Sequence, residues 1–133
     1  MSKRFEQISR VSGFMKHNGG MLFKKISEKN FEFKVKIQKK HLNKRKITHG
    51  GYICAIIDAG AGTAVFRNTG GKSCVTISLD IKFIGMTKLN DTINGKIKII
   101  NKTKSMIFVK CILISKKRAV AYASGIWKVI KKV

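Results

Sequence analysis

Apolar and polar residues alternate along much of the chain, a pattern typical of strands with one buried face. The segment 31–38 has an aromatic or β-branched residue at every odd position and a polar residue between each. The segment 75–83 alternates in the same way, which puts Thr76 and Ser78 on its polar side. Short basic connections near positions 102 and 117 favour antiparallel hairpins. Strands are predicted over six segments: 21–27, 31–38, 75–83, 92–101, 106–115 and 119–130.

Two other segments have helical character. Apolar residues at positions 5, 8, 11 and 15 predict a modest N-terminal helix within residues 1–18, ended by the glycines that follow. The apolar run 52–66 is too long for a strand and too rich in alanine for a loop, so a central helix is predicted over 49–67. Gly60 and Gly62 cost such a helix about 1 kcal/mol each relative to alanine. They indicate close approach of the helix backbone to a sheet or to another subunit.

The order of these elements predicts the fold class. A helix, two strands, a long buried helix and four strands form a single α+β domain spanning residues 1–133. The economical packing of these parts is one long central helix wrapped by one curved antiparallel sheet. A single sheet leaves an apolar face or an edge that a second copy of the chain can cover.

Composition narrows the class of protein. The chain has 133 residues, of which 44% are hydrophobic, so a disordered or fibrous class is disfavoured. No clean membrane-spanning segment and no secretory signal is evident, and we expect a cytoplasmic protein. The three cysteines, Cys54, Cys74 and Cys111, have no CxxC spacing. We therefore expect reduced thiols, no disulfide framework and no metal site.

Charge is the most unusual feature of the composition. Lys and Arg number 29 against 6 Asp and Glu, which gives a net charge of +23. Such a balance attracts polyanions of every kind. The basic residues are spread along the whole chain, however, and a lysine-rich, proline-free composition is typical of an AT-biased coding sequence. No basic–aromatic motif for nucleic acid is present, so nucleic-acid binding beyond non-specific attraction is not expected.

Candidate chemistry gathers at the start of the central helix. The run His49-Gly50-Gly51 leaves backbone N–H groups accessible at the positive end of the helix, where they can stabilise a developing oxyanion. Asp58 follows two turns later inside an apolar run, and a carboxylate there is costly unless it is paired or used. The alternative is that Asp58 faces water or caps a loop and His49 is an ordinary loop residue. The residues alone leave both interpretations open.

The spacing of these residues resembles a known family. His49-Gly50-Gly51 is followed after six residues by Asp58, and a glycine stands four positions further on. Asn43 precedes His49 by six residues, and Thr76 follows Asp58 by eighteen. This pattern, with the chain length and the strand order, resembles the hotdog-fold acyl-CoA thioesterases of the PaaI-like, phenylacetate-pathway type. The resemblance covers nearly the whole chain.

The resemblance implies hydrolysis of acyl-CoA to a free acid and CoA by a dimer, or a dimer of dimers, with its site at the subunit interface. The Gly50 N–H would polarise the thioester carbonyl, and His49 would shape that turn or touch the thioester. Asp58 of the partner subunit would act as general base or as nucleophile. Asn43 would position the substrate or the attacking water, and Thr76 would orient the carboxylate or the water. No cofactor is implied beyond the CoA of the substrate.

Substrate-binding residues are also expected near both ends of the central helix. Gly51 and Tyr52 stand at its start, and Tyr52 with Cys54 replaces the small aliphatic residues more usual in the family. Arg67 and Lys72, near its end, are candidates for the CoA phosphates. A second group comprises Phe14, Met15, Tyr52, Val65 and Phe83, which would line an acyl pocket or belong to the core.

Other functions remain to be weighed against hydrolysis. A hotdog protein that binds acyl-CoA without cleaving it is the main alternative, although the presence of Asp58 and Asn43 disfavours it. A hydratase or dehydratase on the same fold would need a histidine and an acid poised for β-elimination. An aspartate nine residues after His49 is not that arrangement.

Overall fold

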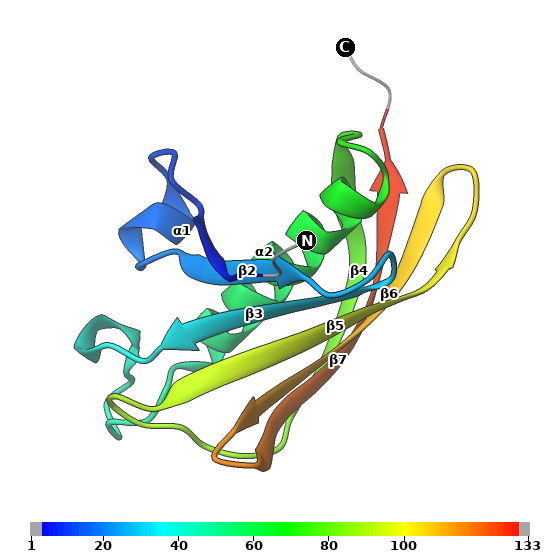
Figure 1. Cartoon of the computed structure of the whole chain (residues 1–133). Helices are drawn as coiled ribbons and strands as arrows, with labels where there is room; N and C mark the ends of the chain where they lie inside the picture. Colours follow the sequence, from blue (N-terminus) through cyan, green and yellow to red (C-terminus); the bar gives the residue numbers. More distant parts are fainter. Residues whose placement is uncertain (1–3, 131–133) are drawn as a thin grey trace.

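A computed structural model describes residues 4–130 of the chain. In this part, one seven-stranded antiparallel sheet curls around one long helix, α2 (Figure 1). Along the sheet the strands follow the order β1-β2-β3-β5-β6-β7-β4. The elements are β1 (Glu6–Ile8), α1 (Phe14–His17), β2 (Met21–Lys25), β3 (Asn30–Lys36), the 3₁₀ turn η1 (Lys39–His41), α2 (Gly50–Asn68), β4 (Cys74–Phe83), β5 (Thr92–Lys102), β6 (Met106–Ser115) and β7 (Arg118–Val129). The predicted α+β architecture is confirmed, and each of the six predicted strands is found within about two residues of its expected bounds.

The core lies between α2 and the concave face of the sheet. The odd-numbered apolar residues of the 31–38 segment, Phe31, Phe33, Val35 and Ile37, are at most 5% exposed, as their alternation predicts. On α2, Ile56, Ile57, Ala64 and Val65 are completely buried. The buried residues of α2 recur in pairs at every fourth position from Tyr52 to Val65, so one face of the helix packs against the sheet, and Asp58 and Phe66 lie on the exposed face.

Phe33 determines how closely α2 approaches the sheet. Its ring lies so near Gly60 of α2 and Gly95 of β5 that a Cβ atom on either glycine would overlap ring carbons. Phe33 itself is completely buried, so the ring has no solvent-filled space into which it can move. The prediction that Gly60 marks a close backbone approach is confirmed. Gly62 differs, because a Cβ there would lie 3.6 Å from Nε1 of Trp127, an ordinary contact.

The predicted N-terminal helix over residues 1–18 is wrong within the described residues. Residues 6–8 pair instead with β2 as an edge strand, and only the single turn α1 is helical. Ser9 has φ 64° and Gly13 has φ 157°, so the backbone leaves the helical region twice in this segment. Val11 and Phe14 are 84% and 66% exposed, so the apolar spacing does not produce a buried face. A short helix without such a face is marginal, whereas an edge strand gains main-chain hydrogen bonds.

β4 is the other edge of the sheet, and its only neighbouring strand in the described part is β7. The register shifts between Thr76 and Ser78, where Ile77 forms a β-bulge. Three apolar side chains near this edge remain open to solvent: Val75 is 45%, Ile77 50% and Phe83 59% exposed. The part of β4 that a second copy could cover is thus markedly apolar.

Replacing Gly60 with alanine tests the Phe33 contact. We expect Gly60→Ala to lower the free energy of unfolding by about 1–3 kcal/mol, because the new methyl group overpacks the Phe33 ring. Gly62→Ala is the matched control in the same helix, and it should raise stability by about 0.5–1 kcal/mol through helix propensity alone. Urea denaturation of both variants measures the difference. Equal effects of the two substitutions would contradict the proposed role of Phe33.

Candidate active site

His49 caps the start of α2 with its own side chain. Its Nδ1 accepts a hydrogen bond from the Gly51 N–H at 2.8 Å, and its carbonyl accepts from the Tyr52 N–H at 3.0 Å. The Gly51 N–H is therefore occupied by the cap. The Gly50 N–H donates to no group in residues 4–130, and it lies at the positive end of the helix. Of the two predicted glycines, Gly50 is the one with a donor available to a ligand.

A buried histidine packs against the first turn of α2. His41 is 2% exposed, and its ring stacks on Tyr52 with centroids 3.7 Å apart. Its Nδ1 accepts from the Gln38 N–H at 3.0 Å, and its Nε2 lies 2.8 Å from the Asn18 carbonyl oxygen. Because a carbonyl can only accept, the ring is neutral with its proton on Nε2. Burial lowers the pKa of His41, and the charge of Lys40 acts in the same direction.

Tyr52 belongs to this buried support. The side chain, expected to bind substrate, is only 6% exposed, and burial raises its pKa to about 12. It borders a small cavity of about 250 Å³ beside Gly19 and Gly20, separate from the cleft that contains Asp58. Its ring packs against His41 at the helix start, and its expected role in substrate binding stays a prediction.

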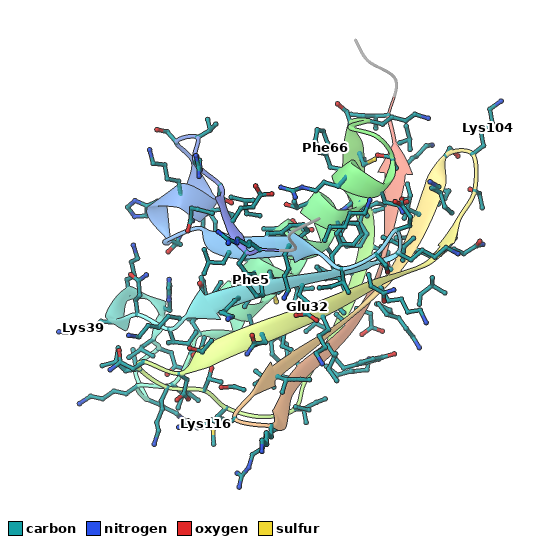
Figure 2. All side chains as sticks on the ribbon, viewed as in Figure 1. Phe5, Glu32, Lys39, Phe66, Lys104 and Lys116 are labelled. Atoms are coloured by element: carbon teal, nitrogen blue, oxygen red, sulfur yellow. The ribbon has the colours of Figure 1, made fainter. Side chains whose placement is uncertain are left out.

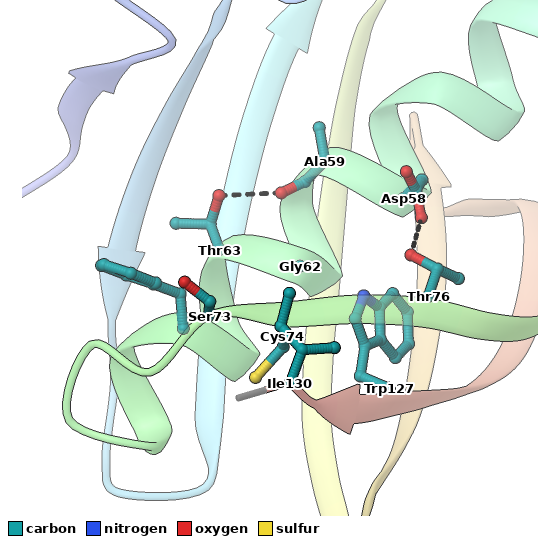
Figure 3. A pocket seen from close by; sticks show the side chains of 10 residues that line it. Asp58, Ala59, Gly62, Thr63, Ser73, Cys74, Thr76, Trp127 and Ile130 are labelled. Atoms are coloured by element: carbon teal, nitrogen blue, oxygen red, sulfur yellow. Dashed lines mark hydrogen bonds between the residues drawn. The ribbon is translucent and has the colours of Figure 1, made fainter. Parts of the chain in front are cut away.

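Asp58 lies two turns further along α2, and its exposed carboxylate faces β4. Thr76 Oγ1 donates a hydrogen bond to Asp58 Oδ1 at 2.7 Å (Figure 3). The bulge at Ile77 makes this contact possible, because Thr76 pairs with the inward-facing Trp127 whereas Ser78 pairs with Ile126 on the outer side. Strict alternation had grouped Thr76 with Ser78 on one face, and the structure corrects that grouping.

The Asp58–Thr76 pair borders an open cleft of about 630 Å³. One wall is the α2 face that follows Asp58 at helical spacing, and the other comes from β4 and the end of β7 (Figure 3). Besides Asp58 and Thr76, the cleft is lined by Ala59, Gly62, Thr63, Phe66, Ser73, Cys74, Trp127 and Ile130. The sequence prediction missed these residues as lining residues. Offsets of one, four, five and eight from Asp58 would have identified those on the helix.

The remaining predicted site residues lie elsewhere. Asn43 Oδ1 accepts hydrogen bonds from the Arg45 and Ile47 N–H groups at 2.9 and 3.4 Å, so it shapes the loop that leads to α2. Arg67 forms an ion pair with Glu6 at 2.6 Å, and its guanidinium lies 4.9 Å from the Phe23 ring centroid. Lys72 borders a second cleft next to the first.

The five residues considered for an acyl pocket are divided between core and surface. Tyr52 and Val65 are buried, Met15 is half-buried, and Phe14 and Phe83 are exposed. None of them lines the Asp58 cleft. Phe83 does lie near the start of α2, since a Cβ on Gly50 would be 3.6 Å from its ring.

The two candidate groups, the Gly50 N–H and the Asp58 carboxylate, stay apart within one chain. Gly50 and Asp58 are separated by eight residues of α2, or about 12 Å at the helical rise of about 1.5 Å per residue. Such a distance is too long for the Gly50 N–H and the Asp58 carboxylate to act on one carbonyl group. A single chain therefore holds two candidate half-sites.

A long helix wrapped by a curved antiparallel sheet defines the hotdog class of folds. Residues 46–122 match the family model described as the thioesterase superfamily. The chain therefore belongs to the thioesterase superfamily and is a thioester hydrolase, which confirms the predicted enzyme class.

Solved structures share the fold at low sequence identity. Zebrafish thioesterase superfamily member 2 superposes with a TM-score of 0.83 at 15% identity, covering 92% of this chain and 90% of that one. A Streptococcus mutans protein bound to acetyl CoA, smu.793, gives 0.81 at 22% identity, covering 96% and 98%. The PaaI protein of E. coli gives 0.73 at 17% identity, covering 78% and 75%. The resemblance to PaaI-like hotdog proteins is thus confirmed.

One relative is similar to this chain over most of its sequence. A Pseudomonas aeruginosa protein with the name "Putative esterase PA0474" is 26% identical over 124 residues, covering 92% of each chain. Within residues 4–130, none of the helices combines the length and the hydropathy of a transmembrane segment.

The buried neutral His41 predicts a pH dependence of stability. Because the fold lowers the pKa of His41, the folded chain binds fewer protons than the unfolded chain below about pH 6.5, the ordinary histidine value. His41 therefore contributes its full stability above about pH 6.5 and loses it as the pH falls towards its folded pKa. We expect Tm to fall between about pH 7 and pH 5, and His41→Asn to flatten that decline. His17→Asn, which removes an exposed histidine, should leave the slope unchanged; equal slopes in all three proteins would overturn the assignment.

Proposed function

We propose that this protein hydrolyses acyl-CoA to a free acid and CoA, with Asp58 as the reacting carboxylate. The observation that carries the proposal is the Asp58–Thr76 hydrogen bond at the border of an open cleft. Membership of the thioesterase superfamily supports the reaction class, and the S. mutans neighbour with bound acetyl CoA supports the substrate class. A carboxylate held by a single hydroxyl keeps lone pairs available for a water molecule or a carbonyl carbon.

The two half-sites support a homodimer as the active unit. β4 is an edge strand with exposed apolar side chains, and a second copy of β4 would pair with it and cover them. Thr76 contacts Asp58, whereas Phe83, seven residues along the same strand, lies beside Gly50. Antiparallel pairing of two β4 strands centred between these positions would put Thr76 of the partner subunit opposite Phe83. Asp58 of the partner subunit would then approach Gly50 of the first.

In the proposed reaction the Gly50 N–H donates to the thioester carbonyl oxygen and stabilises the oxyanion that forms. By one route, the Asp58 carboxylate accepts a proton from water while the water oxygen attacks the carbonyl carbon. By the other, a carboxylate oxygen attacks directly and forms a mixed anhydride that water then opens. Collapse of the tetrahedral intermediate breaks the carbon–sulfur bond and releases the CoA thiolate. Thr76 orients the carboxylate by its hydrogen bond, and no separate cofactor takes part.

Replacing Asp58 tests the proposed catalytic carboxylate. We expect Asp58→Asn to lower kcat about 10²–10⁴-fold, because the amide can neither accept the proton nor act as the nucleophile. The change is isosteric and lies at an exposed position, so Tm should hardly move. Chromatographic measurement of CoA release from a panel of acyl-CoAs, from acetyl to long-chain and aryl-acyl, checks the prediction. Unchanged turnover would overturn the role of Asp58, and acyl-CoA binding without turnover in the wild type would favour a non-catalytic carrier.

Replacing Gly50 tests the oxyanion donor and the composite site together. Gly50 is the first residue of α2 and follows an extended residue, a position where proline is tolerated and removes only the N–H. We expect Gly50→Pro to lower kcat about 10²–10³-fold, whereas Gly50→Ala keeps the donor and most of the activity.

Mixed dimers then test whether the two half-sites come from different subunits. Co-expressed Gly50→Pro and Asp58→Asn chains should regain activity, because one of the two composite sites in each mixed dimer combines an intact Gly50 with an intact Asp58. Failure of the mixture to exceed either parent, with mixed dimers verified by mass, would contradict a site shared between subunits.

A further inference from the structure

A second, larger cleft adjoins the one that contains Asp58. It has a volume of about 920 Å³ and lies between the turn after α2, the tip of the β5–β6 hairpin and the end of β7. Figure 2 labels Lys104 at that hairpin tip. The lining residues are Gly71, Lys72, Ser73, Lys104, Ser105, Lys128, Val129 and Ile130. Ser73 and Ile130 line both clefts, so the two clefts are neighbours.

Three lysines line this second cleft without a counter-charge. Lys72, Lys104 and Lys128 come from three different segments, and none of them forms an ion pair within residues 4–130. No acidic side chain lines the cleft. Three like charges around one depression repel one another unless an anion lies between them. The arrangement therefore favours a ligand with several negative charges.

Other basic sites of the molecule lack this combination. The cleft lined by Lys88, Lys116 and Arg118 also contains Asp91, whose carboxylate lies 3.1 Å from the Lys116 ammonium. Arg67, expected from the sequence to contact CoA, is already paired with Glu6. The lysine cleft combines three cations outside any ion pair of the described residues with a position next to the Asp58 cleft.

We propose that Lys72, Lys104 and Lys128 bind the phosphates of the CoA nucleotide, so that the enzyme selects thioesters that carry this nucleotide. The inference rests on the proposed function. CoA carries a diphosphate and a 3′-phosphate at the end remote from its sulfur, and the pantetheine arm joins the two ends. With the thioester at the Asp58–Thr76 pair, the arm passes Ser73 and Ile130, and the phosphates meet the lysines. Val129 and Ile130 supply an apolar surface for the adenine.

Two matched triple variants distinguish the effect of the cleft lysines from the effect of the overall positive charge. The cleft variant carries Lys72→Gln, Lys104→Gln and Lys128→Gln. The control variant carries Lys96→Gln, Lys98→Gln and Lys110→Gln, which removes the same charge from exposed positions on the outer face of β5 and β6. Each is assayed on an acyl-CoA and on the same acyl group carried by pantetheine, which lacks the nucleotide.

The cleft variant should raise KM for the acyl-CoA about 10- to 100-fold with kcat nearly unchanged, because charge-assisted phosphate contacts are lost. The control variant should change KM by less than about twofold at moderate salt, since it removes only long-range attraction. On acyl-pantetheine all three proteins should behave alike. Equal losses in both variants, or an equal loss of the cleft variant on acyl-pantetheine, would overturn the inference.

Direct binding keeps this test independent of hydrolysis. Calorimetric titration with CoA and with adenosine 3′,5′-bisphosphate should show binding to the wild type and the control variant, and weaker binding to the cleft variant. If the wild type binds CoA in this way but cleaves no acyl-CoA, the proposed hydrolysis is wrong and the phosphate site stands. If acyl-CoA is cleaved and the cleft variant binds CoA as tightly as the wild type, the phosphate site is wrong and the hydrolysis stands.

Discussion

The contact of Phe33 with Gly60 and Gly95 is the constraint on which the rest of the structure depends. It fixes α2 close to the sheet, and every element of the candidate site is carried by that helix or by a strand beside it. A helix held a few tenths of an ångström further out would leave the Phe33 ring without full contact. It would also move Asp58 away from Thr76, whose hydrogen bond spans only 2.7 Å. The packing of α2 and the geometry of the candidate site therefore depend on the same two positions, Gly60 and Gly95, which have no side chain.

The bulge in β4 is a second device that connects fold and chemistry. Without the extra residue at Ile77, strand alternation would turn Thr76 to the outer side of the sheet with Ser78. The bulge turns it towards α2, where its hydroxyl donates to Asp58. One local irregularity thus determines which side chain of β4 contacts the proposed catalytic carboxylate.

Elements with strong periodicity could be predicted from the sequence, and elements determined by tertiary contacts could not. The alternation in β3 and the long apolar run of α2 gave their positions to within a residue or two, because burial on one face or on all faces dictates such patterns. The N-terminal strand β1 was missed because three residues pairing with an edge carry no periodic signal of their own. The face of Thr76 was misjudged because a bulge is one unpaired residue, which alternation cannot reveal.

The candidate site divides in the same way. Asp58 and Gly50 could be named as candidates from the sequence because a carboxylate in an apolar helix and glycines at a helix start are locally unusual. Trp127 and Ile130 were not, since their contribution to the cleft depends on how β7 lies against α2. Tyr52 was expected in the substrate site because of its position in the sequence. Its stacking on His41 could not be foreseen, because His41 is held in place by the carbonyl of Asn18, twenty-three residues earlier in the chain.

The distribution of charge around the two clefts follows from the chemistry proposed for them. A lysine beside Asp58 would stabilise the charged carboxylate and weaken it as a base or nucleophile. In a chain of net charge +23, a carboxylate surrounded only by neutral side chains is therefore a specific arrangement, and the Asp58 cleft has it. Phosphates need the opposite, several cations with no acid between them, and the adjoining cleft has that. High overall basicity cannot produce this contrast, because it would fill both clefts alike.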